Sequence, residues 1–80
     1  MTPQEFAELD MEERIDVLRK DAVYLMGRRN LLHNVFLYSL HGFYVEVFYE
    51  RRSSRIHSID VIVNDEALNV YLDNIHLEIA

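Results

Sequence analysis

The chain has 80 residues, enough for one small domain, and half of them are hydrophobic, which excludes an intrinsically disordered protein. It has no cysteine, so disulfides, thiol nucleophiles and thiolate metal sites are excluded. Its formal net charge of −6 argues against the nucleic-acid-binding class, whose members are typically basic.

The N-terminal residues carry two successive helix-start signals. Thr2 and Glu5 form a predicted capping box, with Pro3 at the first helical position. Asp10 and Glu13 repeat the capping box. We therefore expect a short helical turn, followed by a helix that restarts at residue 11.

The residues after Asp10 predict an amphipathic helix that packs against a sheet. Apolar side chains recur at spacings of 4, 3, 4 and 3, which place them on one face of a helix. They are Met11, Ile15, Leu18, Ala22 and Leu25. Gly27, followed by Arg28 and Arg29, is the expected end of this helix.

After Asn30 the apolar pattern changes to a period of two. Residues 31–40 and 43–50 are rich in Val, Phe and Tyr and predict two strands, joined by a two-residue turn at His41 and Gly42. The expected pairs are Leu40 with Phe43, Tyr38 with Val45 and Phe36 with Val47.

A third strand is expected at about residues 56–63. We place Glu50 opposite Ile56 and Val47 opposite Ile59, because a shift by one residue would bury the carboxylate of Asp60. This register leaves residues 51–55, with the sequence RRSSR, as a loop. It also makes residues 43–50 the central strand and residues 31–40 an edge strand.

The last residues predict a short C-terminal helix. Asn64 or Asp65 can cap it. Its apolar stripe would comprise Leu68, Tyr71, Leu72 and Ile75. The sequence thus predicts a single α+β domain over residues 1–80, with the element order α-β-β-β-α and one three-stranded antiparallel meander.

The second face of the predicted sheet carries more apolar residues than a solvated face normally does. Its expected apolar residues are Val35, Leu37, Tyr44, Phe48, Ile56 and Ile62. Either the C-terminal helix covers this face or a second copy of the chain binds there. The edge strand 31–40 lacks lysine and proline, so it can also accept a partner strand.

The sequence contains weak signals for catalysis or metal binding. Glu46 and Asp60 are expected opposite each other on neighbouring strands. They could form an acid/base pair or a cation site, but we favour two solvated carboxylates. The four histidines lack metal-ligand spacing, and two glycines cannot form a glycine-rich phosphate loop. We therefore expect no enzyme, no catalytic residue, no metal and no cofactor.

One cluster has the composition of an anion-binding or nucleic-acid-binding site. Arg51, Arg52 and Arg55 follow Tyr49, so arginines could bind phosphates while the ring stacks on a base. Residues 28–57 contain five arginines and two glutamates, a net charge of +3. The flanking segments 1–27 and 58–80 have net charges of −4 and −5. Because the flanking segments are acidic, we favour ion pairs between these arginines and acids of this chain or of a second copy over nucleic-acid binding.

These patterns favour a protein that acts by association rather than by catalysis. No apolar run can span a membrane, and the N-terminus is acidic where a signal peptide would be basic, so we expect a cytoplasmic protein without membrane contact. We expect a homodimer, formed through the second sheet face or the edge strand, with another protein as an alternative partner. RNA or single-stranded nucleic-acid binding through residues 51–55 is the alternative function.

Overall fold

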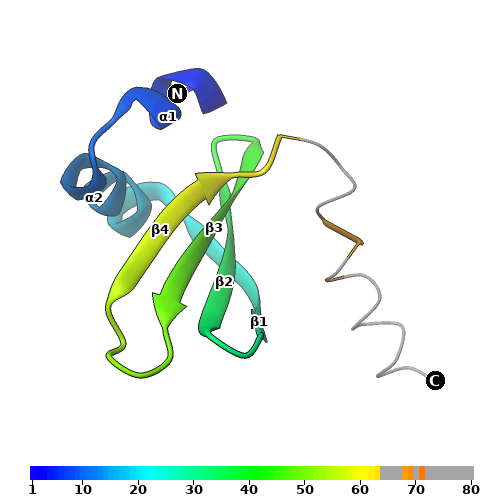
Figure 1. Cartoon of the computed structure of the whole chain (residues 1–80). Helices are drawn as coiled ribbons and strands as arrows, with labels where there is room; N and C mark the ends of the chain where they lie inside the picture. The colour runs from blue at the N-terminus through cyan, green and yellow to red at the C-terminus, as the bar shows by residue number, and fades with distance from the viewer. Residues whose placement is uncertain (64–67, 70, 72–80) are drawn as a thin grey trace.

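The computed structural model describes residues 1–63, 68, 69 and 71 and has an α+β fold (Figure 1). The elements are α1 (Pro3–Glu8), α2 (Met11–Asp21), β1 (Val23–Arg29), β2 (His33–Leu40), β3 (Phe43–Glu50) and β4 (Ile56–Val61). The strands form one antiparallel sheet in the order β1-β2-β3-β4. The α+β class is confirmed, but the prediction of three strands is wrong, and the predicted C-terminal helix lies largely outside the described residues.

The two predicted capping boxes start α1 and α2. The Thr2 hydroxyl accepts a hydrogen bond from the Glu5 backbone N–H at 3.1 Å, and the Thr2 N–H donates to the Glu5 carboxylate at 2.9 Å. Hydrogen bonding of the Glu5 carboxylate to the Thr2 backbone N–H, and secondly to the Thr2 side chain, lowers the pKa of Glu5. Asp10 and Glu13 make the same two bonds at 2.9 and 3.1 Å, so the helix restarts where the sequence predicts.

The predicted second helix is too long, because residues 23–29 form a strand. Helix α2 ends at Asp21, and β1 pairs with β2. Gly27 lies inside β1 and has no positive φ, so it is not a helix cap. A Cβ at this position would lie 3.1 Å from the Phe36 ring, so glycine allows that ring to pack against β1.

The β2–β3 hairpin has the predicted register. Leu40 pairs with Phe43, and the pairing continues to His33 and Glu50. At the turn, His41 and Gly42 both have positive φ, of 47° and 88°. Two such residues in a two-residue connection are typical of a type I′ turn, whose twist matches that of a hairpin.

The β3–β4 register is as predicted only at one end. Val47 pairs with Ile59, but an irregularity after Phe48 brings Ile56 opposite Tyr49 instead of Glu50. The extra residue moves Ile56 to the sheet face that packs against the helices, so its predicted place on the second face is wrong.

Strand β2 is not an edge strand, contrary to the sequence prediction. It lies between β1 and β3, and the edges are β1 and β4. The reason is the unrecognised strand β1, which pairs with residues 34–39 of β2. Among the described strands, β1 and β4 are therefore the ones that could accept a partner strand.

The main core lies between the helices and one face of the sheet. Its buried residues are Phe6, Leu40, Phe43, Val45, Val47 and Ile59. The Phe6 ring from α1 meets the Phe43 ring edge-on at 6.1 Å. Phe43 directly follows the β2–β3 turn, and α1 lies at the same end of the sheet as this turn (Figure 1). Arg14 of α2 donates hydrogen bonds to the carbonyls of Ala7 and Ile59, at 2.7 and 2.9 Å. These contacts hold both helices against one part of the sheet.

We predict that Phe6→Ala lowers the free energy of unfolding by about 3–5 kcal/mol, because it removes a fully buried ring and leaves a cavity. Urea unfolding followed by circular dichroism measures this loss. The control is Met11→Ala, an exposed apolar residue at the start of α2, for which we expect a loss below about 1 kcal/mol. Equal losses in both variants would show that α1 does not contribute to the core.

Candidate interaction surfaces

The predicted second face of the sheet is partly covered within the chain. Val35 and Leu37 are buried there, and Phe48 and Ile62 are half-buried. Tyr44 is 39% exposed. Tyr71, from the C-terminal part of the chain, lies on this face with only 2% of its surface exposed.

A charged cluster joins Tyr71 to this face. Glu46 of β3 is 8% exposed, and its Oε2 atom accepts a hydrogen bond from the Tyr71 hydroxyl at 2.6 Å. The same oxygen accepts a bond from Arg28 Nη2 of β1 at 3.1 Å. The Arg28 guanidinium also lies over the rings of Phe48 and Tyr71, at 5.8 and 5.6 Å.

The environment of this cluster favours a charged Arg28 beside a neutral tyrosine. Burial and the hydrogen bond to Glu46 raise the pKa of the Tyr71 hydroxyl. For Arg28, burial lowers the pKa, but the interactions with Tyr71 and Glu46 outweigh it and raise the pKa overall. The cluster therefore fixes the position of Tyr71. Arg28 was predicted to lie at a helix end, and no local sequence pattern indicated that it would bind Glu46.

Glu46 and Asp60 are paired across β3 and β4, as the register predicts. Their surroundings differ, however, because Glu46 binds Arg28 and Tyr71 whereas Asp60 is exposed and accepts a bond from the Ser58 hydroxyl at 3.3 Å. Within residues 1–63, 68, 69 and 71, no three His, Asp or Glu side chains are grouped as metal ligands. Of the two carboxylates, only Glu46 is therefore held by partners from other strands of the chain.

The three loop arginines and Tyr49 do not form one site. Arg51 is occupied with the neighbouring loop, where its guanidinium donates to the carbonyls of Asn30 and Leu31 at 3.3 and 3.4 Å. Arg52 and Arg55 are exposed. Tyr49 instead lies on the helix-facing side of the sheet, where its ring meets Phe36 at 5.4 Å.

A row of aromatic rings on the helix-facing side was not predicted from the sequence. Tyr24 of β1 meets Phe36 and Tyr38 of β2 edge-on at 6.0 and 5.7 Å, and Phe36 in turn meets Tyr49. We call these four residues the aromatic row. Burial, with the neighbouring tyrosines, raises the pKa of Tyr38, whereas Tyr24 is 53% exposed.

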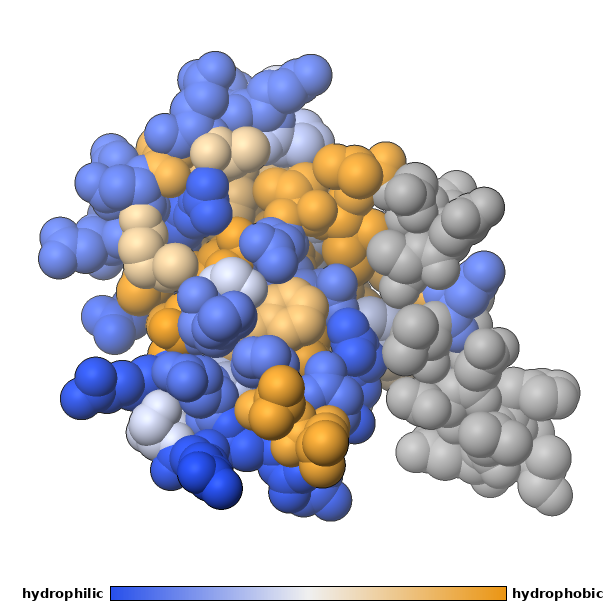
Figure 2. Space-filling model, in the orientation of Figure 1, coloured by the Kyte–Doolittle hydropathy of each residue, from blue (hydrophilic) through white to orange (hydrophobic). Residues whose placement is uncertain are grey.

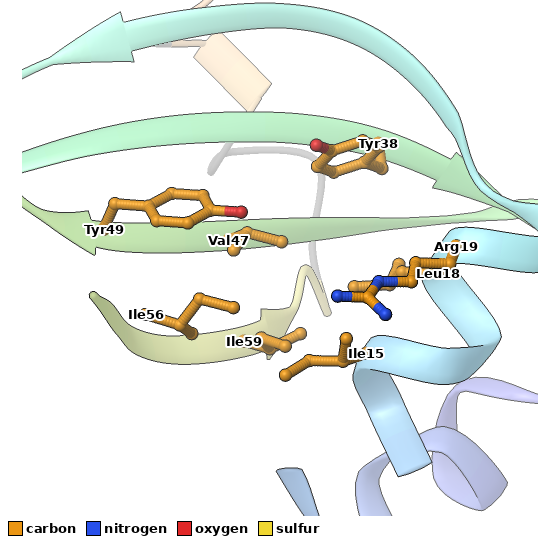
Figure 3. A pocket seen from close by; sticks show the side chains of 8 residues that line it. All are labelled: Ile15, Leu18, Arg19, Tyr38, Val47, Tyr49, Ile56 and Ile59. Carbon is orange, nitrogen blue, oxygen red and sulfur yellow. The ribbon is translucent and has the colours of Figure 1, made fainter. Parts of the chain in front are cut away.

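The aromatic row continues into a groove between α2 and the sheet (Figure 3). The groove has a volume of about 200 Å³ and is lined by Ile15, Leu18, Arg19, Tyr38, Val47, Tyr49, Ile56 and Ile59. In Figure 3 the tyrosines and aliphatic side chains of the sheet face α2 across this space. Helix α2 therefore leaves part of this apolar face open.

No protein family model, no curated protein and no solved structure matches the chain. Among the described residues, no helix is long and apolar enough to cross a membrane. The function is therefore inferred from the surfaces themselves.

We predict that Tyr71→Phe lowers the free energy of unfolding at pH 7 by about 1.5–3 kcal/mol, because it removes a hydrogen bond to the buried Glu46 carboxylate. Chemical denaturation measures the loss. Tyr44→Phe, at an exposed tyrosine on the same face, is the control, with an expected change below about 0.5 kcal/mol. A loss no larger than that of the control would contradict the assigned role of Tyr71.

The same variant tests the raised pKa of Tyr71. A folded-state pKa above the ordinary value of 10.0 adds stability that is complete below pH 10 and is lost as the pH rises further. We therefore expect the stability difference between the wild type and Tyr71→Phe to shrink above about pH 10. A difference that grows with pH would contradict the raised pKa.

Proposed function

We propose that the chain acts by forming a homodimer through the aromatic row and the outer edge of β1. The observation that carries this proposal is that three consecutive apolar residues of an edge strand, Val23, Tyr24 and Leu25, are exposed, and that Tyr24 is the outermost ring of the aromatic row. Exposed apolar surface of this kind marks sites of association.

The composition of this surface supports a protein contact. Tyrosine and phenylalanine are enriched in protein interfaces, because each ring buries a large apolar area with little loss of side-chain freedom. Three of the four residues of the aromatic row are tyrosines, whose hydroxyl groups can hydrogen-bond at the rim of a contact. The same strand β1 is an edge of the sheet, so it also offers backbone groups to a partner.

The charges at the two ends of β1 are complementary to those of a second copy of the chain. Strand β1 follows the acidic segment 1–22, with seven acids and three bases, and ends at the exposed Arg29. Two β1 strands that pair in antiparallel orientation bring the basic end of each next to the acidic helices of the other. The irregularity between Tyr24 and Met26 interrupts a regular ladder, so we assign most of the contact to side chains.

This proposal keeps the homodimer expected from the sequence but changes its surface. Val35 and Leu37, expected at the interface, are buried within the chain, and Ile56 is on the opposite face. Nucleic-acid binding through residues 51–55 is not favoured by any particular contact, since Arg51 is occupied and Tyr49 is turned to the other side.

We predict that the wild-type chain is a dimer at micromolar concentration and that Tyr24→Asp makes it a monomer, because the charge would be buried without a partner in the contact. Light scattering after size-exclusion chromatography, over a range of concentrations, measures the mass. Circular dichroism checks that the variant is folded, as expected for a half-exposed position.

The matched variant is Tyr44→Asp, which places the same charge at an exposed tyrosine of the second face. We expect it to remain a dimer. If Tyr44→Asp is monomeric and Tyr24→Asp is not, the second face is the interface and our assignment is wrong. A wild-type chain that is monomeric at all concentrations would refute the homodimer itself.

A further inference from the structure

Two loops lie side by side at the end of the sheet opposite the β2–β3 turn. They are residues 30–32, between β1 and β2, and residues 51–55, between β3 and β4. The Arg51 backbone N–H donates to the Leu32 carbonyl at 3.0 Å, and the Arg51 side chain reaches the carbonyls of residues 30 and 31. The loops therefore form one connected surface.

Two leucines of the first loop are exposed to solvent. Leu31 is 87% exposed and Leu32 is 68% exposed. Their backbone is fixed by Asn30, whose side-chain oxygen accepts hydrogen bonds from the N–H groups of Leu32 and His33 at 3.0 and 2.8 Å. The Asn30 N–H also donates to the His33 carbonyl at 3.0 Å. The hydrogen bonds of the turn therefore hold the two leucines in their exposed positions.

Four arginines lie in or next to these two loops. Arg29 ends β1 just before the first loop, and Arg51, Arg52 and Arg55 belong to the second. Arg51 and Arg52 line the same hollow as the two leucines, which measures about 680 Å³. Glu50 is the acid that lines this hollow, so the four arginines give this end of the sheet a positive charge, although the net charge of the chain is −6.

Figure 2 shows the hydropathy of the surface at this end of the sheet. At the end where these loops lie in Figure 1, a small hydrophobic patch is surrounded by hydrophilic side chains. We call this surface, comprising Leu31, Leu32, Arg29, Arg51, Arg52 and Arg55, the leucine–arginine tip.

We propose that the leucine–arginine tip docks on an anionic lipid bilayer. The two leucines enter the interfacial layer, and the arginines bind lipid phosphate and carboxylate groups, which are complementary in charge. Such contact needs no spanning helix, so it is compatible with the absence of one among the described residues. The expectation of no membrane contact rested on the lack of a spanning run and of a signal peptide, and neither bears on contact with the bilayer surface.

The observations favour lipid over nucleic acid at this tip. Tyr49, the ring that was predicted to stack on a base, faces the helix side of the sheet and is not available at this tip. Leucines that project at the tip contribute nothing to phosphate binding. In a bilayer, by contrast, each leucine removes apolar surface from water.

The test uses sedimentation of the full chain with vesicles. One set contains phosphatidylcholine with about 30% phosphatidylserine, and the other contains phosphatidylcholine alone. We expect binding to the first set that is at least tenfold stronger than to the second and that weakens as salt is raised.

Two variants separate the contributions of the tip. Leu31→Ser with Leu32→Ser is expected to reduce binding to the anionic vesicles at least tenfold, since it removes the inserted apolar groups. Arg52→Ala with Arg55→Ala is expected to reduce binding and its salt dependence. Arg51 is kept, because its hydrogen bonds hold the two loops together.

Matched controls carry the same chemical changes elsewhere. Val63→Ser alters an exposed apolar residue next to Pro3 and Gln4 of the N-terminal segment, and Arg19→Ala removes an exposed cation of α2. We expect both to bind anionic vesicles within about twofold of the wild type.

Three outcomes would overturn the proposal. They are absence of binding to anionic vesicles at low salt, equal binding to both vesicle sets, and binding that the leucine changes leave intact. A titration with single-stranded oligoribonucleotide completes the test. Binding to RNA that depends on Arg52 and Arg55 but not on the leucines, without binding to vesicles, would assign the tip to nucleic acid instead.

Discussion

The pairing of β1 with β2 is the constraint on which the other features depend. It makes β2 an internal strand, and it sets Arg28 on the face that carries Glu46. It also places Tyr24 next to Phe36, which starts the aromatic row. Finally, the short connection between β1 and β2 forces residues 30–32 into a tight turn, where they meet the loop of residues 51–55. Each proposed surface therefore requires this one strand pairing.

The buried carboxylate of Glu46 is acceptable only because of that pairing. An unpaired carboxylate so far from water would cost several kcal/mol, whereas one bound to Arg28 and Tyr71 has its charge compensated and its oxygen hydrogen-bonded. The pair adds little net stability compared with apolar residues of similar shape. Its effect is one of specificity, since it joins β1, the internal strand β3 and the C-terminal part of the chain at one point.

The sequence predicts those parts of the fold whose signals are local. Both capping boxes and the His41–Gly42 turn depend on a few adjacent residues, and all three are confirmed. Strand β1 was missed because Ala22 and Leu25 continue the helical spacing of α2, while its strand state depends on pairing with β2. The bulge that moves Ile56 likewise has no local signal. The contacts of Tyr24 in the aromatic row and the role of Arg28 follow from β1, so they could not be predicted without it.

The two proposed surfaces share β1 but lie at different places along it. The exposed Val23, Tyr24 and Leu25 are at its start, whereas Arg29 and the leucine–arginine tip are at its end. In an antiparallel dimer the two β1 strands run in opposite directions, so the two tips point away from each other. One flat bilayer could then engage only one tip at a time, and dimerisation would not increase the affinity for a single membrane. Such a dimer would instead present one lipid-binding tip at each end.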